Sequence, residues 1–153
     1  METTEKKTEG IATSLNVLLA DEYMVYTKTR NACWNIDGQT FKDLNTFFQI
    51  QYEELFYMID EIGERIRMLG HYAIGSLKDF LEFTHLPEEK HHYTDQKNRL
   101  SALISDHESI IRVIQNDIVP ITERHQDMAT INFVTGIRQQ NEKMARMLRA
   151  YIE

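Results

Sequence analysis

The stretch FKDLNTFFQIQYEELFYMIDEIGERIRMLG (Phe41–Gly70) points to the fold, because it forms one uninterrupted amphipathic helix pattern. Its apolar residues recur at spacings of four and three, the period of an α-helix with one buried face. They are Phe48, Tyr52, Leu55, Ile59, Ile62, Ile66 and Leu69. Gly70 follows the last of them and predicts a helix C-cap. We therefore expect a helix over Phe41–Leu69, about 43 Å long at about 1.5 Å per residue.

Three more long helical patterns flank this helix, and no strand pattern is convincing. The first covers residues 9–36 and ends at the turn signal Asp37–Gly38. Its stripe consists of Ile11, Leu15, Leu18, Glu22, Val25, Thr29, Cys33 and Ile36. The next pattern opens at Pro87, and we expect Pro120 to break it. The last covers residues 122–151.

A short helix is expected around Ser76–Phe83, in the link between the second and third long helices. The patterns together predict an all-α protein, an antiparallel four-helix bundle whose long link crosses the bundle. We expect a single domain over residues 1–153, with residues 1–8 as a flexible N-terminal tail. His107 lies on the third apolar stripe, with Leu100, Leu103, Ile110, Ile114 and Ile118, so we interpret it as a hydrogen-bonded core histidine and not as a ligand.

Composition limits the classes of function. The chain has 153 residues and a formal net charge of −7, which argues against a surface for duplex DNA. No apolar run approaches the roughly 18 residues that span a bilayer. The first ten residues lack the apolar core of a signal peptide. Because the single cysteine cannot form an internal disulfide, these features favour the cytoplasm and no contact with membranes.

A polar line runs beside the apolar stripe of the Phe41–Leu69 helix. It consists of Asn45, Gln49, Glu53, Phe56, Asp60 and Glu64. Asp60 and Glu64 are a carboxylate pair one helical turn apart, so they repel each other unless a cation lies between them. A hard metal ion is one such cation. The alternative is an ordinary solvated helix face.

Geometry adds a condition to the metal interpretation. Asn45 and Asp60 lie about 22 Å apart along one helix, so a single copy of the line cannot surround one metal ion. Two antiparallel copies about a twofold axis near Glu53 and Phe56 could do so. Asn45 and Gln49 of one subunit would then face the second subunit's acidic pair. The line therefore predicts a symmetric dimer formed through this helix.

The run LNVLLADEYMVYTKTRNACWNIDGQTFKDLNTFFQIQYEELFYMIDEIGERIRMLG and the tail QQNEKMARMLRAYIE resemble the Dps family, the mini-ferritins. The likeness covers nearly the whole chain from Leu15. It implies a ferritin-like bundle, a dodecameric homo-oligomer, iron binding and storage, and protection against oxidative stress. It also implies a ferroxidase site between two subunits at a twofold interface.

The resemblance assigns roles to individual positions. One subunit of the family supplies a histidine before the tryptophan, a histidine on the second helix and an acid four residues later; here these are Cys33, Asn45 and Gln49. The partner's acidic pair matches Asp60 and Glu64, which are retained. The last helix often carries a histidine before EKM, and Asn141 stands there.

The three substitutions remove two nitrogen donors and one negative charge from the implied site. We therefore expect weak iron affinity and slow or absent ferroxidation there. A relocated site that uses Glu53, Cys33 and the retained pair is the alternative. Acids at the start of the last helix line the threefold pores of the family; Asp127 matches one of them, while Asn132 replaces another.

Cys33 allows three interpretations. It is a small buried hydrophobe on the apolar stripe, a ligand for a softer metal such as zinc, or a redox-active thiol. For the whole protein, the first hypothesis is an iron-storing shell with a degraded ferroxidase centre. The second is a non-catalytic shell that keeps its assembly and has lost iron oxidation. DNA compaction ranks lower, because the N-terminal segment is not basic.

Overall fold

The computed structural model describes residues 4–38, 41–88 and 95–152, and every regular element in these ranges is helical. The elements are α1 (Thr4–Trp34), α2 (Phe41–Met68), α3 (Leu77–Phe83), α4 (Gln96–Val113), a π-helical segment η1 (Ile114–Ile118), α5 (Val119–Arg124) and α6 (Met128–Ala150). The segments α4, η1 and α5 follow one another without a gap and form one rod. The predicted all-α four-helix bundle is confirmed. No described helix is long and apolar enough to cross a membrane.

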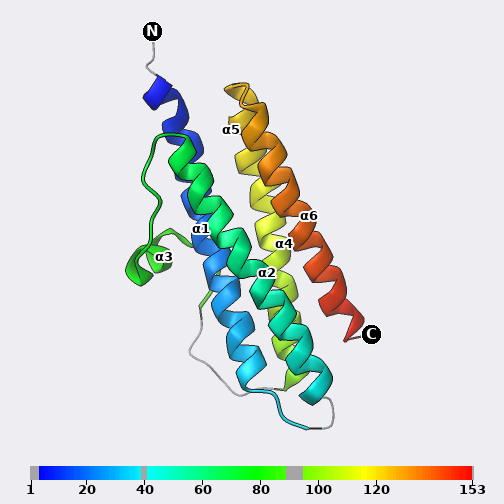
Figure 1. The fold of residues 1–153 in the computed structure, drawn as a ribbon. Coiled ribbons are helices and arrows are strands. Elements are labelled where there is room, and N and C mark those ends of the chain that lie inside the picture. The colour runs from blue at the N-terminus through cyan, green and yellow to red at the C-terminus, as the bar shows by residue number, and fades with distance from the viewer. Residues whose placement is uncertain (1–3, 39–40, 89–94, 153) are drawn as a thin grey trace.

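The bundle consists of two antiparallel pairs, α1 with α2 and the α4–α5 rod with α6 (Figure 1). Since α2 and the rod run in the same direction, the link between them returns along the length of the bundle. The short helix α3 lies in this link, as predicted, and it packs beside α1. Ser76 caps it, because its hydroxyl oxygen accepts a hydrogen bond from the Asp79 N–H at 3.1 Å.

The predicted apolar stripes form the core. Every predicted position on α1, from Ile11 to Cys33, is at most 5% exposed. On the rod, the positions from Leu100 to Ile118 are at most 2% exposed, and His107 is among them. The stripe on α2 ends at Gly70, whose positive φ of 90° suits a residue without a side chain beyond the helix end. Burial of one face on each long helix therefore sets the architecture.

The expected starts of α1 and α4 differ from the structure. Residues 4–8, expected in a flexible tail, form the first turns of α1, and residues 1–3 lie outside the described ranges. The prediction that the third long helix starts at Pro87 is wrong, because α4 begins at Gln96. Asp95 caps α4 through a carboxylate that accepts from the Asn98 N–H at 2.9 Å. Pro87 is instead held outside the helix by Lys28, which donates to its carbonyl oxygen.

Pro120 does not break the third helix. Proline lacks an N–H, and its ring crowds the turn before it in an ordinary α-helix. The wider π-helical turn at Ile114–Ile118 absorbs this conflict, and the rod continues to Arg124. The chain turns only afterwards, where Gln126 has a positive φ of 56°. The last helix therefore begins at Met128 and not at the expected Thr122.

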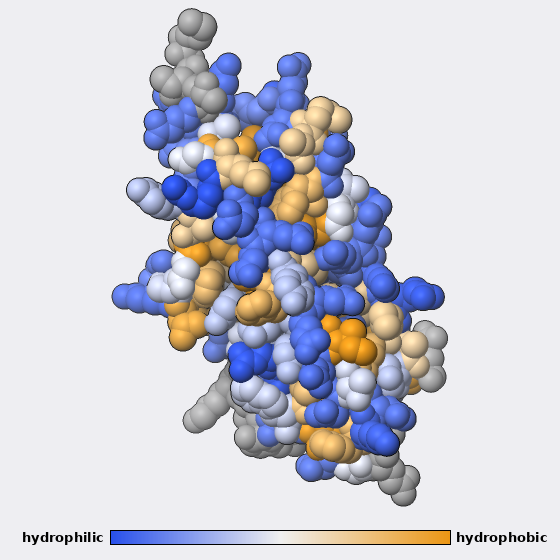
Figure 2. Space-filling model, in the orientation of Figure 1, coloured by the Kyte–Doolittle hydropathy of each residue, from blue (hydrophilic) through white to orange (hydrophobic). Residues whose placement is uncertain are grey.

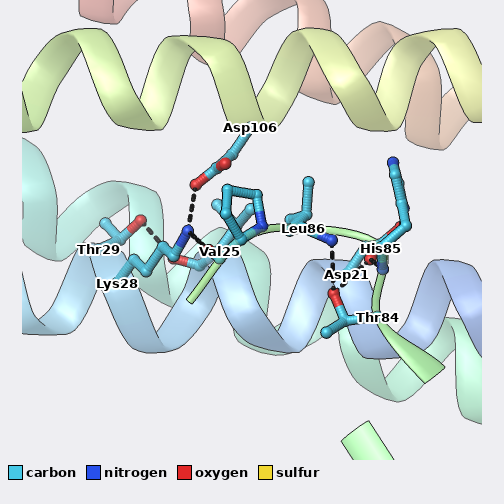
Figure 3. Close-up of polar contacts among 9 residues, drawn as sticks. Asp21, Val25, Lys28, Thr29, Thr84, His85, Leu86 and Asp106 are labelled. Atoms are coloured by element: carbon cyan, nitrogen blue, oxygen red, sulfur yellow. Dashed lines mark hydrogen bonds and ion pairs between the residues drawn. The ribbon is translucent and has the colours of Figure 1, made fainter. Parts of the chain in front are cut away.

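Polar contacts fix the link between α2 and α4 to the bundle (Figure 3). Asp21 of α1 is fully buried, and its carboxylate accepts from the Thr84 hydroxyl at 2.6 Å and from the His85 N–H at 3.0 Å. The His85 ring also contacts this carboxylate. Lys28 forms an ion pair with Asp106 of α4 at 3.0 Å, beside its contact with the link. These contacts bind the link to α1.

The molecular face in Figure 2 is mostly hydrophilic, with apolar residues in separate spots. Several large apolar side chains are nevertheless exposed on single elements. They include Phe56 and Tyr57 on α2, and Leu77 and Leu81 on α3, each at least 50% exposed.

Candidate metal site on helix α2

The predicted polar line lies along the outer face of α2, away from the core. Leu44, Leu55 and Ile62 are fully buried on the inner face. Gln49, Glu53, Asp60 and Glu64 are exposed, and Asn45 is half-buried. The amphipathic pattern of the helix thus presents these polar side chains outward, where a second subunit could approach them.

Cys33 and Asn45, the two positions where the resemblance implies histidines, bond to each other. The Cys33 thiol lies 3.5 Å from the Asn45 carbonyl oxygen, to which it donates. The Asn45 amide nitrogen donates to the Cys33 sulfur at 3.4 Å and to the Cys33 carbonyl oxygen at 3.3 Å. The end of α1 and the start of α2 are therefore joined at the position where the implied site would bind a metal.

Cys33 is buried in an apolar cluster that includes Ala32, Leu44 and Phe48. Burial raises the pKa of its thiol, so the thiolate that attacks oxidants or binds metals is disfavoured. These observations support the packing interpretation of Cys33. A redox-active thiol would need a lowered pKa and solvent access, and Cys33 has neither.

Gln49 and Glu53 form a second local pair. The Gln49 amide nitrogen donates to the Glu53 carboxylate at 3.3 Å. Both side chains are exposed, so this bond is weak and a cation could displace it. Glu53 is therefore free to act as a ligand, as the relocated-site alternative requires.

Asp60 and Glu64 are exposed one turn apart on α2. Within the described part of the chain, neither carboxylate has a hydrogen-bond or ion-pair partner. No group of three His, Cys, Asp or Glu side chains among the described residues could hold a metal ion. A metal site that used this polar line would therefore need a second, antiparallel copy of α2, as the separation of about 22 Å along the helix also requires.

The predicted pore residue Asp127 has a structural role at the start of α6. One carboxylate oxygen accepts from the Thr130 N–H at 3.1 Å, and the other accepts from the Thr130 hydroxyl at 2.5 Å. Asp127 is thus the N-cap of α6. Its half-buried carboxylate is engaged within the chain, whereas Asn132 is exposed and uncharged.

A hydrogen-bonded network of polar residues in the core was predicted only in part. His107 is fully buried and hydrogen-bonded, as predicted, and its partner is Asn141 of α6 at 2.8 Å. Asn141 also donates to Glu22 of α1 at 2.7 Å. The sequence held a signal for this network, because each of the three residues is a polar position on an otherwise apolar stripe.

Comparison with known proteins gives the class first. The ferritin-like domain family model matches residues 12–153. The chain resembles Dps from Thermosynechococcus elongatus with a TM-score of 0.92 and 26% identity, covering 99% of this chain and 96% of the other. It resembles the Dps protein of Vibrio cholerae O1 with a TM-score of 0.90 and 27% identity, covering 97% and 92% of the two chains. The Vibrio protein is itself described as a member of a broad superfamily of ferritin-like diiron-carboxylate proteins.

Relatives at the sequence level narrow the class. The chain is 30% identical to DNA protection during starvation protein 2 of Bacillus anthracis, over 90% of this chain and 93% of that protein. It is 35% identical to a low temperature-induced protein of Nostoc sp. strain PCC 7120, over 98% and 84% of the two chains. The protein belongs to the Dps family of ferritin-like proteins.

Proposed function

We propose that the protein is an iron-binding mini-ferritin shell whose ferroxidase centre is degraded in one half. Membership in the Dps family supports iron as the metal. The observation that carries the degraded centre is the bonding of Cys33 to Asn45. A buried thiol and an amide that bind each other do not offer the two imidazole nitrogens that an iron site of this family uses.

The retained half keeps the chemistry of a hard cation. Asp60 and Glu64 supply carboxylate oxygens that are free of partners within the described chain. Carboxylate oxygens bind hard cations, and two carboxylates one helical turn apart can concentrate cations even without imidazole. In the proposed dimer, α2 of one subunit brings this pair to the Asn45 and Gln49 face of the other. Fe(II) would then bind weakly and oxidise slowly.

Assembly into a homo-oligomeric shell, with the dodecamer as the expected form, is part of the proposal. The exposed apolar side chains of α2 and α3 support it, because Phe56, Tyr57, Leu77 and Leu81 would be covered at an interface through α2. The net charge of −7 per chain disfavours DNA as a partner and favours the uptake of cations into an acidic shell.

The test is Fe(II) loading without oxygen, followed by hydrogen peroxide, with ferric absorbance recorded against a protein-free blank. The wild type is compared with the double variant Asp60→Ala/Glu64→Ala and with Glu82→Gln, an exposed acid on α3, as the control. Slow oxidation that is faster than the blank and is lost in the double variant supports the proposal. Oxidation at the blank rate in all samples favours the non-catalytic shell, the second hypothesis.

A further inference from the structure

Glu22, Asn141 and His107 form a continuous hydrogen-bonded network through the centre of the bundle. They come from α1, α6 and α4 respectively, and all three are fully buried. The Asn141 amide nitrogen donates to the Glu22 carboxyl oxygen Oε1 at 2.7 Å. The Asn141 amide oxygen lies 2.8 Å from Nδ1 of His107. The network has no part in the candidate metal site on α2.

The amide orientation of Asn141 requires a proton on Nδ1 of His107. The amide nitrogen also donates to the Ile137 carbonyl oxygen at 2.9 Å, so it faces two acceptors. The amide oxygen therefore faces the histidine and accepts from an Nδ1–H group. Nε2 of His107 and Oε2 of Glu22 are buried, and neither has a hydrogen-bond partner among the described residues.

The network joins the two halves of the bundle. Helix α6 packs mainly along the α4–α5 rod and meets α2 at few points, and it lies diagonally across the core from α1 (Figure 1). The bond from Asn141 to Glu22 spans this diagonal, where backbone packing between α1 and α6 is absent within the described ranges. A further polar contact of α6 with the α1–α2 pair comes from the Gln51 amide, which donates to the Met144 carbonyl oxygen at 3.2 Å.

No cation faces Glu22 among the described residues. Its neighbour Asp21 has the same sign of charge and is paired with His85 of the link. On α4, Asp106 is paired with Lys28, and burial lowers the pKa of His107 to about 4, so His107 is neutral near pH 7. The buried residues of α2 include no charged group, and on α6 Arg138 pairs with Glu142 on the surface. An ionised Glu22 would therefore be a buried charge without a counter-charge, which is costly.

We propose that the Glu22–Asn141–His107 network is a protonation-dependent latch that holds α6 to the α1–α2 half of the bundle. A neutral Glu22 carboxylic acid favours the closed latch, and ionisation of that carboxyl shifts the equilibrium toward the open state. It is not a metal site, because a carboxyl and an imidazole separated by an amide are too few ligands, and no three-ligand group exists among the described residues.

The pKa shifts of Glu22 and His107 set the pH range over which the latch opens. Burial raises the pKa of Glu22 to about 8, with a smaller increase from Asp21, while the bond from Asn141 acts in the opposite direction. Burial lowers the pKa of His107 to about 4. An opened latch regains the usual values of 4.5 and 6.5. Between pH 4.5 and 6.5 the contributions of Glu22 and His107 to the opening equilibrium cancel. Above pH 6.5 the equilibrium constant for opening rises with pH, by at most about tenfold per pH unit, until the pH is near 8.

Hydrogen exchange of α6 followed by mass spectrometry tests the latch, with rates corrected for the intrinsic pH dependence of exchange. From pH 6.5 to 8 the protection of α6 should fall about tenfold in the wild type. It should not fall over this range in Glu22→Gln, which is neutral at both pH values. Glu9→Gln, the same change at an exposed position of α1, should behave as the wild type. Equal loss in Glu22→Gln, or no loss in the wild type, overturns the proposal.

A second measurement decides the matter if Glu22→Gln does not fold. Labelling with [13Cδ]glutamate separates glutamate carboxyls from Asp21 and Asp106 in the infrared spectrum. The wild-type protein and Glu9→Gln should both show a labelled carboxylic-acid band at pH 6.5 that disappears with a midpoint near 8. Absence of that band at pH 6.5 overturns the latch.

Discussion

Replacement of Glu22 by glutamine should change how the free energy of unfolding depends on pH. The native pKa of about 8, against 4.5 for an unperturbed group, means that Glu22 ionises when the protein unfolds at neutral pH. The native state then binds more protons than the unfolded state, so stability is lost as pH rises from 4.5 to about 8. At pH 7 this costs the wild type about 3 kcal/mol, at about 1.4 kcal/mol for each pH unit above the unperturbed pKa.

Glutamine keeps an oxygen that accepts from Asn141 and carries no titratable proton. The stability of Glu22→Gln minus that of the wild type should therefore rise with pH, by about 1.4 kcal/mol per pH unit over this window. Below pH 4.5 this difference in the free energy of unfolding should not change with pH, whatever the pH-independent effect of replacing the carboxyl by an amide. Urea unfolding at one protein concentration and several pH values measures it, with Glu9→Gln as the exposed control. Parallel pH profiles for Glu22→Gln and the wild type would show that Glu22 is not a neutral acid in the native protein.

Three further outcomes are expected. The Cys33 thiol, buried and with a raised pKa, should react with a thiol reagent at least about tenfold more slowly in the native protein than after denaturation; equal rates would contradict the packing interpretation. Lys28→Met should destabilise the protein in urea by about 3 kcal/mol, because it leaves the buried Asp106 carboxylate unpaired, whereas Lys42→Met on the exposed face of α2 should have little effect. Asp127→Ala should cost about 1 kcal/mol of stability by removing the α6 cap, and Asp127→Asn should cost less; equal losses would count against the capping role.

The helices and their buried faces were predictable because they depend on local periodicity. The stretch Phe41–Gly70 alone defines a buried face and a C-cap, and α2 follows it closely. The effect of Pro120 was not predictable in the same way. A proline in a helical pattern predicts a break in the helix. The packing of Ile114 and Ile118 in the core favours a wider helical turn over such a break, and this packing is not visible in the sequence.

In the candidate site, too, some features follow from the local sequence and others depend on how the chain packs. The polar line on α2 and the need for two copies of it follow from helix geometry and the sequence. The hydrogen bonds between Cys33 and Asn45 could not be predicted in this way, because they depend on how the chain connects α1 to α2. The latch was missed for a related reason. Its residues lie on three helices, so their contact appears only when the helices are packed.

Restoration of the lost ligands tests whether the three substitutions limit iron oxidation. In the variant Cys33→His/Asn45→His/Gln49→Glu, both imidazoles and the acid return to the positions that the family uses. The measurement is the initial rate of Fe(II) oxidation by hydrogen peroxide, with the triple variant that also carries Asp60→Ala/Glu64→Ala as the control. We expect the restored protein to oxidise Fe(II) at least about tenfold faster than the wild type, and the control to lose this gain. A wild type that already oxidises Fe(II) as fast as the restored variant would contradict a degraded ferroxidase centre.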